Sequence, residues 1–91
     1  LIEGTYVAPR NKLETMICKV FSDSLGREVG LHDDFFKLGG TSILAIQVVS
    51  KLRKDLNFWL EVGDIFKYRT VFQLISTVQL SKKAYYGPEL H

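Results

Sequence analysis

The residues best suited to chemistry lie between positions 33 and 43, where a serine follows two glycines at the predicted start of a helix. Gly39 and Gly40 allow a sharp turn and keep side chains from crowding Thr41 and Ser42. Unpaired backbone N–H groups and the positive end of the helix dipole favour an anion at such a position. A phosphate ester on Ser42 would therefore be stabilised there, although Ser42 or Thr41 is also an ordinary helix cap.

A second interpretation makes Ser42 the nucleophile of an enzyme. A nucleophile elbow needs glycines at alternate positions on both sides of the serine, and Leu44 occupies the second of these positions. The two histidines are His32, in the predicted loop, and His91, at the end of the chain. No oxyanion-stabilising group is evident beside Ser42, so we expect no catalysis and interpret His32 as an ordinary surface histidine.

Helical periodicity predicts the elements that position Ser42. Apolar residues recur at helical spacing in residues 12 to 25 and again in residues 41 to 56. A short helical turn is expected at residues 61 to 67, and Thr70 is a suitable cap for a last helix. The predicted fold class is therefore all-α, a small bundle of three main helices plus one short helix.

A long segment without helical or strand periodicity, residues 26 to 41, separates the first two helices. Loops of this length inside compact domains are often functional. Large apolar side chains should fix the loop on the helices, which predicts an ordered loop, and the paired carboxylates of Asp33 and Asp34 should cap its turns. The expected apolar anchors are Val29, Leu31, Phe35, Phe36 and Leu38.

The second predicted helix has an apolar face and a polar face. At about 100° per residue, six residues fall on the face directed at the core, namely Leu44, Ala45, Val48, Val49, Leu52 and Leu56. Ile43 falls in the middle of the polar face, and Ile46 lies toward its border. We predict that Ile43 and Ile46 contribute to a surface read by partner proteins; the alternative is that the loop covers and buries Ile43.

The length of 91 residues is enough for one modest core and therefore for one domain. Asn11, with Glu14 three residues later, has the spacing of a helix capping box. We predict a domain at residues 11 to 80, an N-terminal linker at residues 1 to 10 and a C-terminal linker at residues 81 to 91. The chain is expected to be a piece of a longer protein.

Charge and composition argue against several classes of partner. The net charge is +2, and the 12 basic and 10 acidic residues are dispersed along the chain, which does not favour nucleic-acid binding. No apolar run approaches the roughly 20 residues that span a membrane. Cys18 is the single cysteine, so an internal disulfide is impossible and no metal site is predicted. We expect Cys18 to be buried and the protein to be cytoplasmic.

Residues 6 to 78 resemble the peptidyl carrier (thiolation) domains of nonribosomal peptide synthetases. The matching blocks follow the family's order and spacing and are Tyr6-Val7-Ala8-Pro9-Arg10, Leu25-Gly26, Asp33-Asp34-Phe35-Phe36, Leu38-Gly39-Gly40-Thr41-Ser42, Asp64-Ile65-Phe66 and Thr70-Val71. Three positions depart from the pattern. Thr41 stands where the family more often has His or Asp, Arg69 replaces a common proline, and Phe72 is bulkier than the usual residue.

By this resemblance, Ser42 is the serine to which a phosphopantetheinyl transferase attaches the 4'-phosphopantetheine arm of coenzyme A, within the motif that includes Gly39, Gly40 and Thr41. The arm holds aminoacyl or peptidyl groups as thioesters and delivers them to adenylation, condensation and thioesterase-type domains. The resemblance implies a non-catalytic domain, and we expect it to be monomeric when isolated. The alternative is an acyl carrier domain of a polyketide or hybrid synthase, which uses the same arm; the Leu38–Ser42 wording and the segment before the domain favour the peptidyl type.

Overall fold

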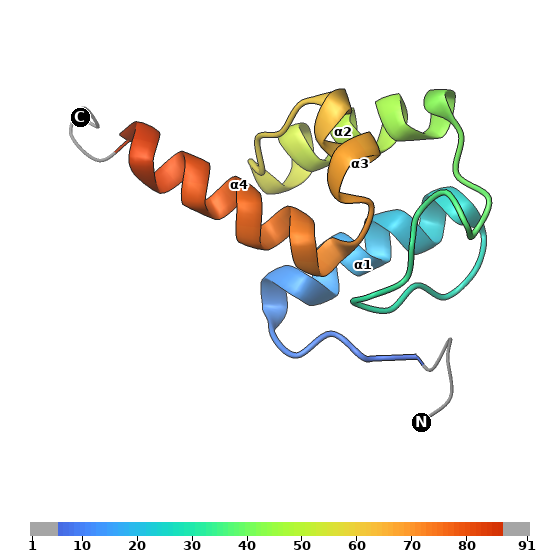
Figure 1. Ribbon diagram of the computed structural model, residues 1–91. Helices are drawn as coiled ribbons and strands as arrows, with labels where there is room; N and C mark the ends of the chain where they lie inside the picture. The colour runs from blue at the N-terminus through green and yellow to red at the C-terminus, as the bar shows by residue number, and fades with distance from the viewer. Residues whose placement is uncertain (1–5, 87–91) are drawn as a thin grey trace.

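Four helices form the framework of the computed structural model (Figure 1). The structure describes the backbone of residues 6–86 and the side chains of residues 6–78, and no strand occurs within these limits. The helices are α1 (Lys12–Leu25), α2 (Ser42–Leu56), α3 (Val62–Tyr68) and α4 (Val71–Tyr86). The prediction of an all-α bundle with three main helices and one short helix is therefore confirmed.

The core lies where the four helices meet the long loop. α1 packs against α2 and α4, and the short α3 contacts both α2 and α4 (Figure 1). The loop contributes as much to the core as the helices do, because Phe35 is fully buried and meets Phe21 of α1 edge to face, with ring centroids 5.2 Å apart. The prediction of an ordered loop is confirmed by its buried anchors, Val29, Leu31 and Phe35, and by its partly buried anchors, Phe36 and Leu38.

The start of α1 carries a buried carboxylate. The Asn11 side chain accepts a hydrogen bond from the Glu14 N–H at 2.9 Å, as the capping spacing predicts. The Glu14 carboxylate, however, turns to Arg10, accepting from its backbone N–H at 2.7 Å and from Nη2 at 2.6 Å. Hydrogen bonding from Arg10 is the main reason that the pKa of Glu14 is lowered. Glu14 thus remains charged although only 4% of its surface is exposed.

Two residues of α1 show where its apolar stripe ends. Cys18 is buried, as predicted, and burial raises the pKa of its thiol to about 11. Met16, which falls in the same helical pattern, is 37% exposed and lies at the edge of the core. The thiol is therefore protonated and shielded, as expected for a small hydrophobic residue of the core.

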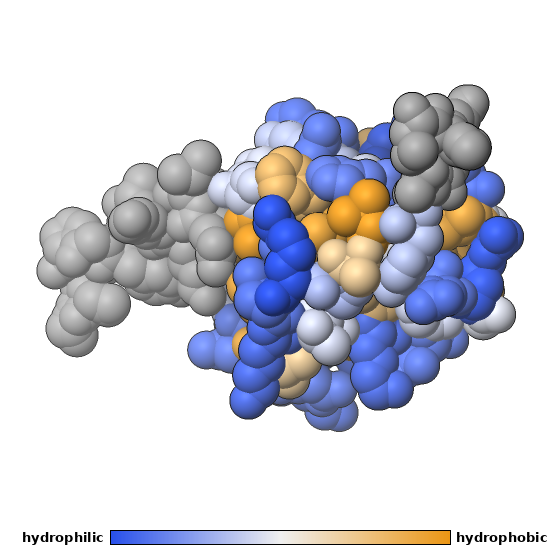
Figure 2. All heavy atoms as spheres, turned by 90° about the horizontal axis from the view of Figure 1, so that it is seen from below, coloured by the Kyte–Doolittle hydropathy of each residue, from blue (hydrophilic) through white to orange (hydrophobic). Residues whose placement is uncertain are grey.

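The segment before α1, residues 6–10, is an N-terminal strap that packs on the domain. The Leu31 N–H donates to the Val7 carbonyl at 2.8 Å, which ties the strap to the loop. Gly30 is required beneath it, because a Cβ there would lie 2.7 Å from the Val7 oxygen and 2.9 Å from a ring carbon of Tyr6. Figure 2 views this side of the molecule and shows hydrophilic residues around a small hydrophobic group. Five residues of the predicted N-terminal linker therefore lie against the domain.

The other end of the molecule is the long helix α4. Thr70 caps it, accepting from the Gln73 N–H at 3.1 Å, as predicted. α4 then continues through Tyr86, six residues into the segment predicted as the C-terminal linker, while the predicted stop at residues 87 and 88 lies outside the described residues. No helix in the described part of the chain is long and apolar enough to cross a membrane.

Candidate functional site

The start of α2 presents an exposed serine beside a capping threonine. Thr41 is the N-cap: its Oγ1 accepts from the Leu44 N–H at 3.2 Å, and its carbonyl accepts from the Ala45 N–H at 2.9 Å. Ser42 is the first helical residue and is exposed. Its hydroxyl forms no hydrogen bond with any described residue. The cap role therefore falls to Thr41, which leaves the Ser42 oxygen available to a reagent from solution.

The two glycines before this serine are required for different reasons. Gly39 has a φ of 110°, a conformation that side chains disfavour, and no atom lies near the position that its Cβ would take. Gly40 is crowded instead: a Cβ there would overlap the ring of Phe35, and its N–H donates to the Phe35 carbonyl at 2.9 Å. The predicted sharp turn is confirmed, and it places the start of α2 directly on the buried ring of the loop.

Hydrogen bonds hold the loop in this shape. Asp34 Oδ1 accepts from the Phe36 N–H at 2.9 Å, and Asp33 Oδ2 accepts from the Gly30 N–H at 2.7 Å, which confirms that the paired carboxylates cap turns. Asp34 also forms an ion pair with Arg69 at 3.0 Å. Because the Arg69 carbonyl accepts from the Phe35 N–H at 2.9 Å, the loop before Ser42 is fastened to the end of α3.

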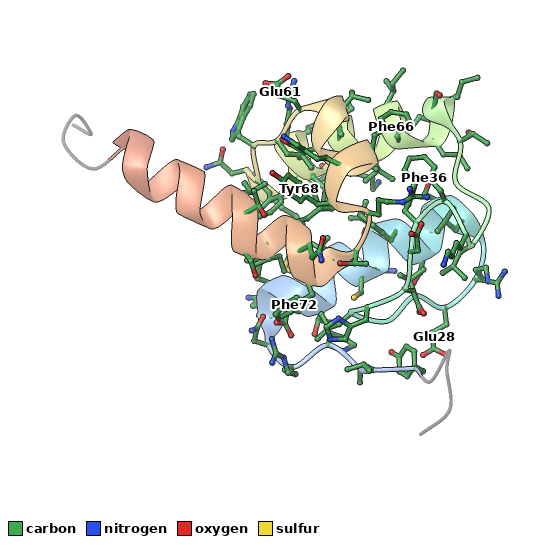
Figure 3. All side chains as sticks on the ribbon, viewed as in Figure 1. Glu28, Phe36, Glu61, Phe66, Tyr68 and Phe72 are labelled. Carbon is green, nitrogen blue, oxygen red and sulfur yellow. The ribbon has the colours of Figure 1, made fainter. Side chains whose placement is uncertain are left out.

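Aromatic contacts reinforce the same connection. Phe36 of the loop stacks on Phe66 of α3, with ring centroids 4.8 Å apart and planes 19° apart (Figure 3). The Arg69 guanidinium lies over the Phe36 ring, 5.1 Å from its centroid. Arg69, the departure from a common proline, has a left-handed backbone with φ of 57° and supplies both a cation and a carbonyl to the loop. The loop and α3 therefore form one surface beside Ser42.

Exposed apolar side chains occur on this surface. Ile43 is 67% exposed and Ile46 is 54% exposed, so the alternative in which the loop buries Ile43 is wrong. Phe66 on α3 and Trp59 on the segment before α3 are 45% and 51% exposed. Their role as a surface for partners stays a prediction. Sequence reasoning did not single out Trp59, although a tryptophan outside the periodic segments was a signal available in the sequence.

The start of α2 suits a phosphate ester. The backbone N–H groups of Ser42 and Ile43 form no hydrogen bond with described residues, and no acidic residue lies in the first turn of α2. His32 packs against the ring of Phe72, with centroids 5.0 Å apart, and forms no hydrogen bond with Ser42 in the described part of the chain. The donor set therefore fits an anionic group on Ser42 better than it fits a serine–histidine pair.

Comparisons with known proteins agree with this chemistry. The family model described as "Phosphopantetheine attachment site" matches residues 12–78. The chain is 41% identical over 76 residues to a beauvericin nonribosomal cyclodepsipeptide synthetase of Beauveria bassiana, and the match covers 84% of this chain. It is 46% identical over 83 residues, or 90% of this chain, to a linear gramicidin synthase of Brevibacillus parabrevis. The chain spans about 2% of the length of each of these relatives.

A solved structure agrees in fold as well. It is a peptidyl carrier protein in complex with the phosphopantetheine transferase Sfp and coenzyme A. The superposition has a TM-score of 0.76 with 28% sequence identity and covers 82% of this chain and 99% of that chain. The similarity therefore extends over essentially the whole of that carrier protein.

Proposed function

Because the chain belongs to the phosphopantetheine attachment site family and is a peptidyl carrier (thiolation) domain of nonribosomal peptide synthesis, we propose that Ser42 carries its 4'-phosphopantetheine arm. One observation supports this assignment above all others. Ser42 has an exposed hydroxyl without a protein hydrogen bond at the first position of α2, next to backbone N–H groups that are also unpaired. The surrounding motif residues Gly39, Gly40 and Thr41 shape the turn and cap the helix.

Each residue of the site has a separate task in this proposal. The N–H groups of Ser42 and Ile43 and the helix dipole stabilise the phosphate, Thr41 holds the helix start, and the glycines keep the approach open. The arm, when attached, supplies a thiol that holds an aminoacyl or peptidyl group as a thioester. The domain itself contributes a tether that raises the effective concentration of the bound group at successive active sites. We infer that it performs no catalysis of its own.

The partners follow from this role. We propose that a phosphopantetheinyl transferase modifies the domain and that adenylation, condensation and thioesterase-type domains act on the loaded arm. We also place the domain in the cytoplasm and expect it to be a monomer when isolated, without a nucleic-acid or membrane partner. The dispersed charge and the net charge of +2 support the expectation on nucleic acid.

Incubation with coenzyme A and a broad-specificity phosphopantetheinyl transferase tests the function. We expect the intact mass to increase by one phosphopantetheinyl group. Trypsin digestion should place the added mass on the peptide of residues 38–51, and fragmentation of that peptide should assign it to Ser42 rather than to Thr41 or Ser50. An unchanged intact mass, or an addition at another residue, would contradict the proposal.

Ile43 and Ile46 support a proposal about partner recognition. Any enzyme that acts on Ser42 must approach the start of α2, where Ile43 is 67% exposed. Ile43→Asp should therefore slow modification by the transferase by at least about fivefold, which corresponds to about 1 kcal/mol of lost binding, while the free energy of unfolding stays nearly unchanged. Initial rates and urea unfolding curves measure the two effects.

Gln47→Asp is the matched control, because Gln47 is exposed on the same polar face one turn further along α2. It introduces the same charge without removing an apolar anchor, so its rate should stay close to that of the wild type. Equal rates for the wild type and Ile43→Asp would exclude the contact. Equal slowing by both substitutions would attribute the effect to charge alone.

A further inference from the structure

A groove separates α2 from the segment that leads into α3. Its volume is about 390 Å³, and its lining includes Ile46, Val49, Arg53, Lys54, Trp59 and Val62. The lining is mainly apolar, and its two charged residues, Arg53 and Lys54, are both cations. This groove is therefore suited to an uncharged, largely apolar ligand.

Trp59 forms a fixed wall of the groove although half of it is exposed. The Arg53 guanidinium lies 5.1 Å from the centroid of its ring, and the indole N–H donates to Asn57 Oδ1 at 2.8 Å. Arg53 is itself held, because its Nε and Nη2 donate to the Leu60 carbonyl at 3.0 and 2.7 Å. The indole is thus held in place with 51% of its surface exposed and contributes little to the core.

The groove follows the face of α2 that carries Ser42. Positions 42, 46, 49 and 53 are separated by four, three and four residues, so they share one side of the helix. At 1.5 Å per residue, Ile46 lies about 6 Å and Arg53 about 16 Å beyond Ser42 along the helix axis. A phosphopantetheine arm attached to serine has the bonds of about five peptide residues and spans about 17 Å when extended. The length of the arm therefore matches the distance to Trp59.

We propose that the arm, at rest, lies along this groove and that Trp59 contacts its thiol end together with the loaded group. The apolar part of the arm next to the phosphate would pack on Ile46 and Val49, and the loaded group would pack on the exposed part of the indole. The cations Arg53 and Lys54 disfavour a basic side chain there. The favoured loads are therefore aminoacyl groups with apolar or aromatic side chains. This inference rests on the proposed attachment at Ser42.

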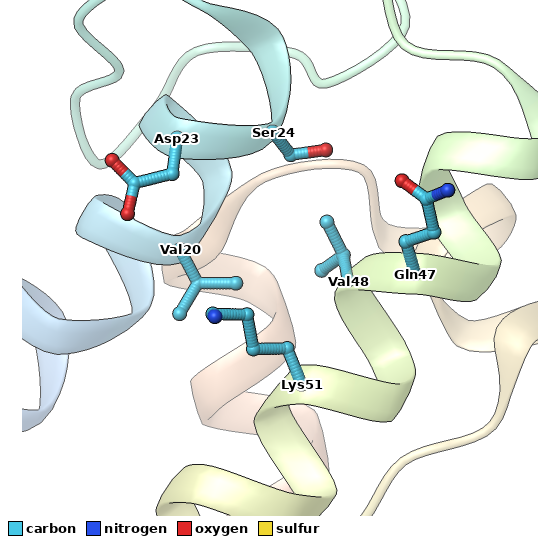
Figure 4. Close-up of a pocket in the computed structure, with 6 residues that line it drawn as sticks. All are labelled: Val20, Asp23, Ser24, Gln47, Val48 and Lys51. Carbon is cyan, nitrogen blue, oxygen red and sulfur yellow. The ribbon is translucent and has the colours of Figure 1, made fainter.

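A second groove, between α1 and α2, is less suitable for the arm (Figure 4). Its volume is about 220 Å³, and the buried Ser24 hydroxyl at its wall has no hydrogen-bond partner. Gln47 and Lys51, which contribute the α2 side of this groove, lie about 140° and 180° around the helix from Ser42. An arm from Ser42 would have to pass around α2 to reach it. The groove beside Trp59 needs no such detour.

Nitrogen-15 NMR spectra of the full chain before modification, after modification and after loading with phenylalanine test the proposal. Intact mass first establishes that the arm is attached, so an absent mass increase counts against the proposed function. With the arm attached, we expect the indole N–H signal of Trp59 and the amide signals of Ile46 and Val49 to shift, and to shift further on loading. Unchanged signals there on fully modified protein would overturn the groove proposal alone. Shifts confined to Val20, Ser24 and Gln47 would also overturn it.

Thiol accessibility provides an independent measurement. Trp59→Ala should increase the rate at which the arm's thiol reacts with a soluble disulfide reagent by about three- to tenfold, because an aromatic contact of ordinary strength is lost. Trp59→Phe should restore most of the protection, and Gln47→Ala, on the other side of α2, should have no effect. Equal thiol reactivity in the wild type and Trp59→Ala, with the NMR spectra of both variants showing intact folds, would overturn the proposal.

Discussion

Ser42→Ala is expected to abolish attachment of the phosphopantetheine arm while leaving the helical fold intact. The substitution removes the oxygen that forms the phosphate ester. It leaves the start of α2 stable because Thr41, rather than Ser42, accepts the capping hydrogen bond from Leu44. The intact mass after incubation with coenzyme A and the transferase should equal that of the starting protein. Thermal unfolding should change little, as for other exposed positions.

Thr41→Ala is the control for this experiment. Loss of the cap should cost about 1 kcal/mol of stability, yet the variant should still accept the arm, because Ser42 is unchanged. The two substitutions therefore have opposite signatures at adjacent positions. Modification that persists in Ser42→Ala would show that another residue carries the arm.

Leu52→Ala is expected to destabilise the domain by about 2–5 kcal/mol, the usual cost of truncating a fully buried leucine. Leu52 is 0% exposed and lies on the face of α2 directed at the core. Because domains of this size have only a small total stability, the loss should appear as a large decrease in the urea midpoint. Urea unfolding followed by circular dichroism measures it.

Ile46→Ala is the matched comparison on the same helix. Its side chain is 54% exposed, so the change in the free energy of unfolding should stay within about 1 kcal/mol. If the two substitutions destabilise the domain equally, the assignment of the two faces of α2 is wrong.

Local signals in the sequence were sufficient for most of the framework. The predicted bounds of the first helix agree with α1, Lys12–Leu25, because apolar spacing, an Asn11 cap and a Gly26 stop act within a few residues of one another. The exposed position of Ile43 followed from helical phase alone. The apolar loop residues predicted its attachment to the core, since side chains of that size are rarely left in solvent.

Contacts between distant segments were beyond the reach of those signals. The capping-box spacing did not reveal that Glu14 pairs with Arg10, because the choice depends on how the strap approaches α1. Thr41 and Ser42 are both good caps, so only the backbone geometry distinguishes the cap from the exposed serine. Arg69 looked like a lost proline, whereas its contacts with Asp34 and Phe36 arise from tertiary packing.

The strap has a consequence for where the folded unit begins. If the chain started at Asn11, the N–H of Leu31, a residue that is 1% exposed, would lose the Val7 carbonyl as its acceptor. An unpaired backbone donor in a buried residue costs about 1–3 kcal/mol. Glu14 would also keep a negative charge in a buried position without its counterion from Arg10. In terms of hydrogen-bond and charge accounting, the domain is complete only when Val7 to Arg10 are counted as part of it.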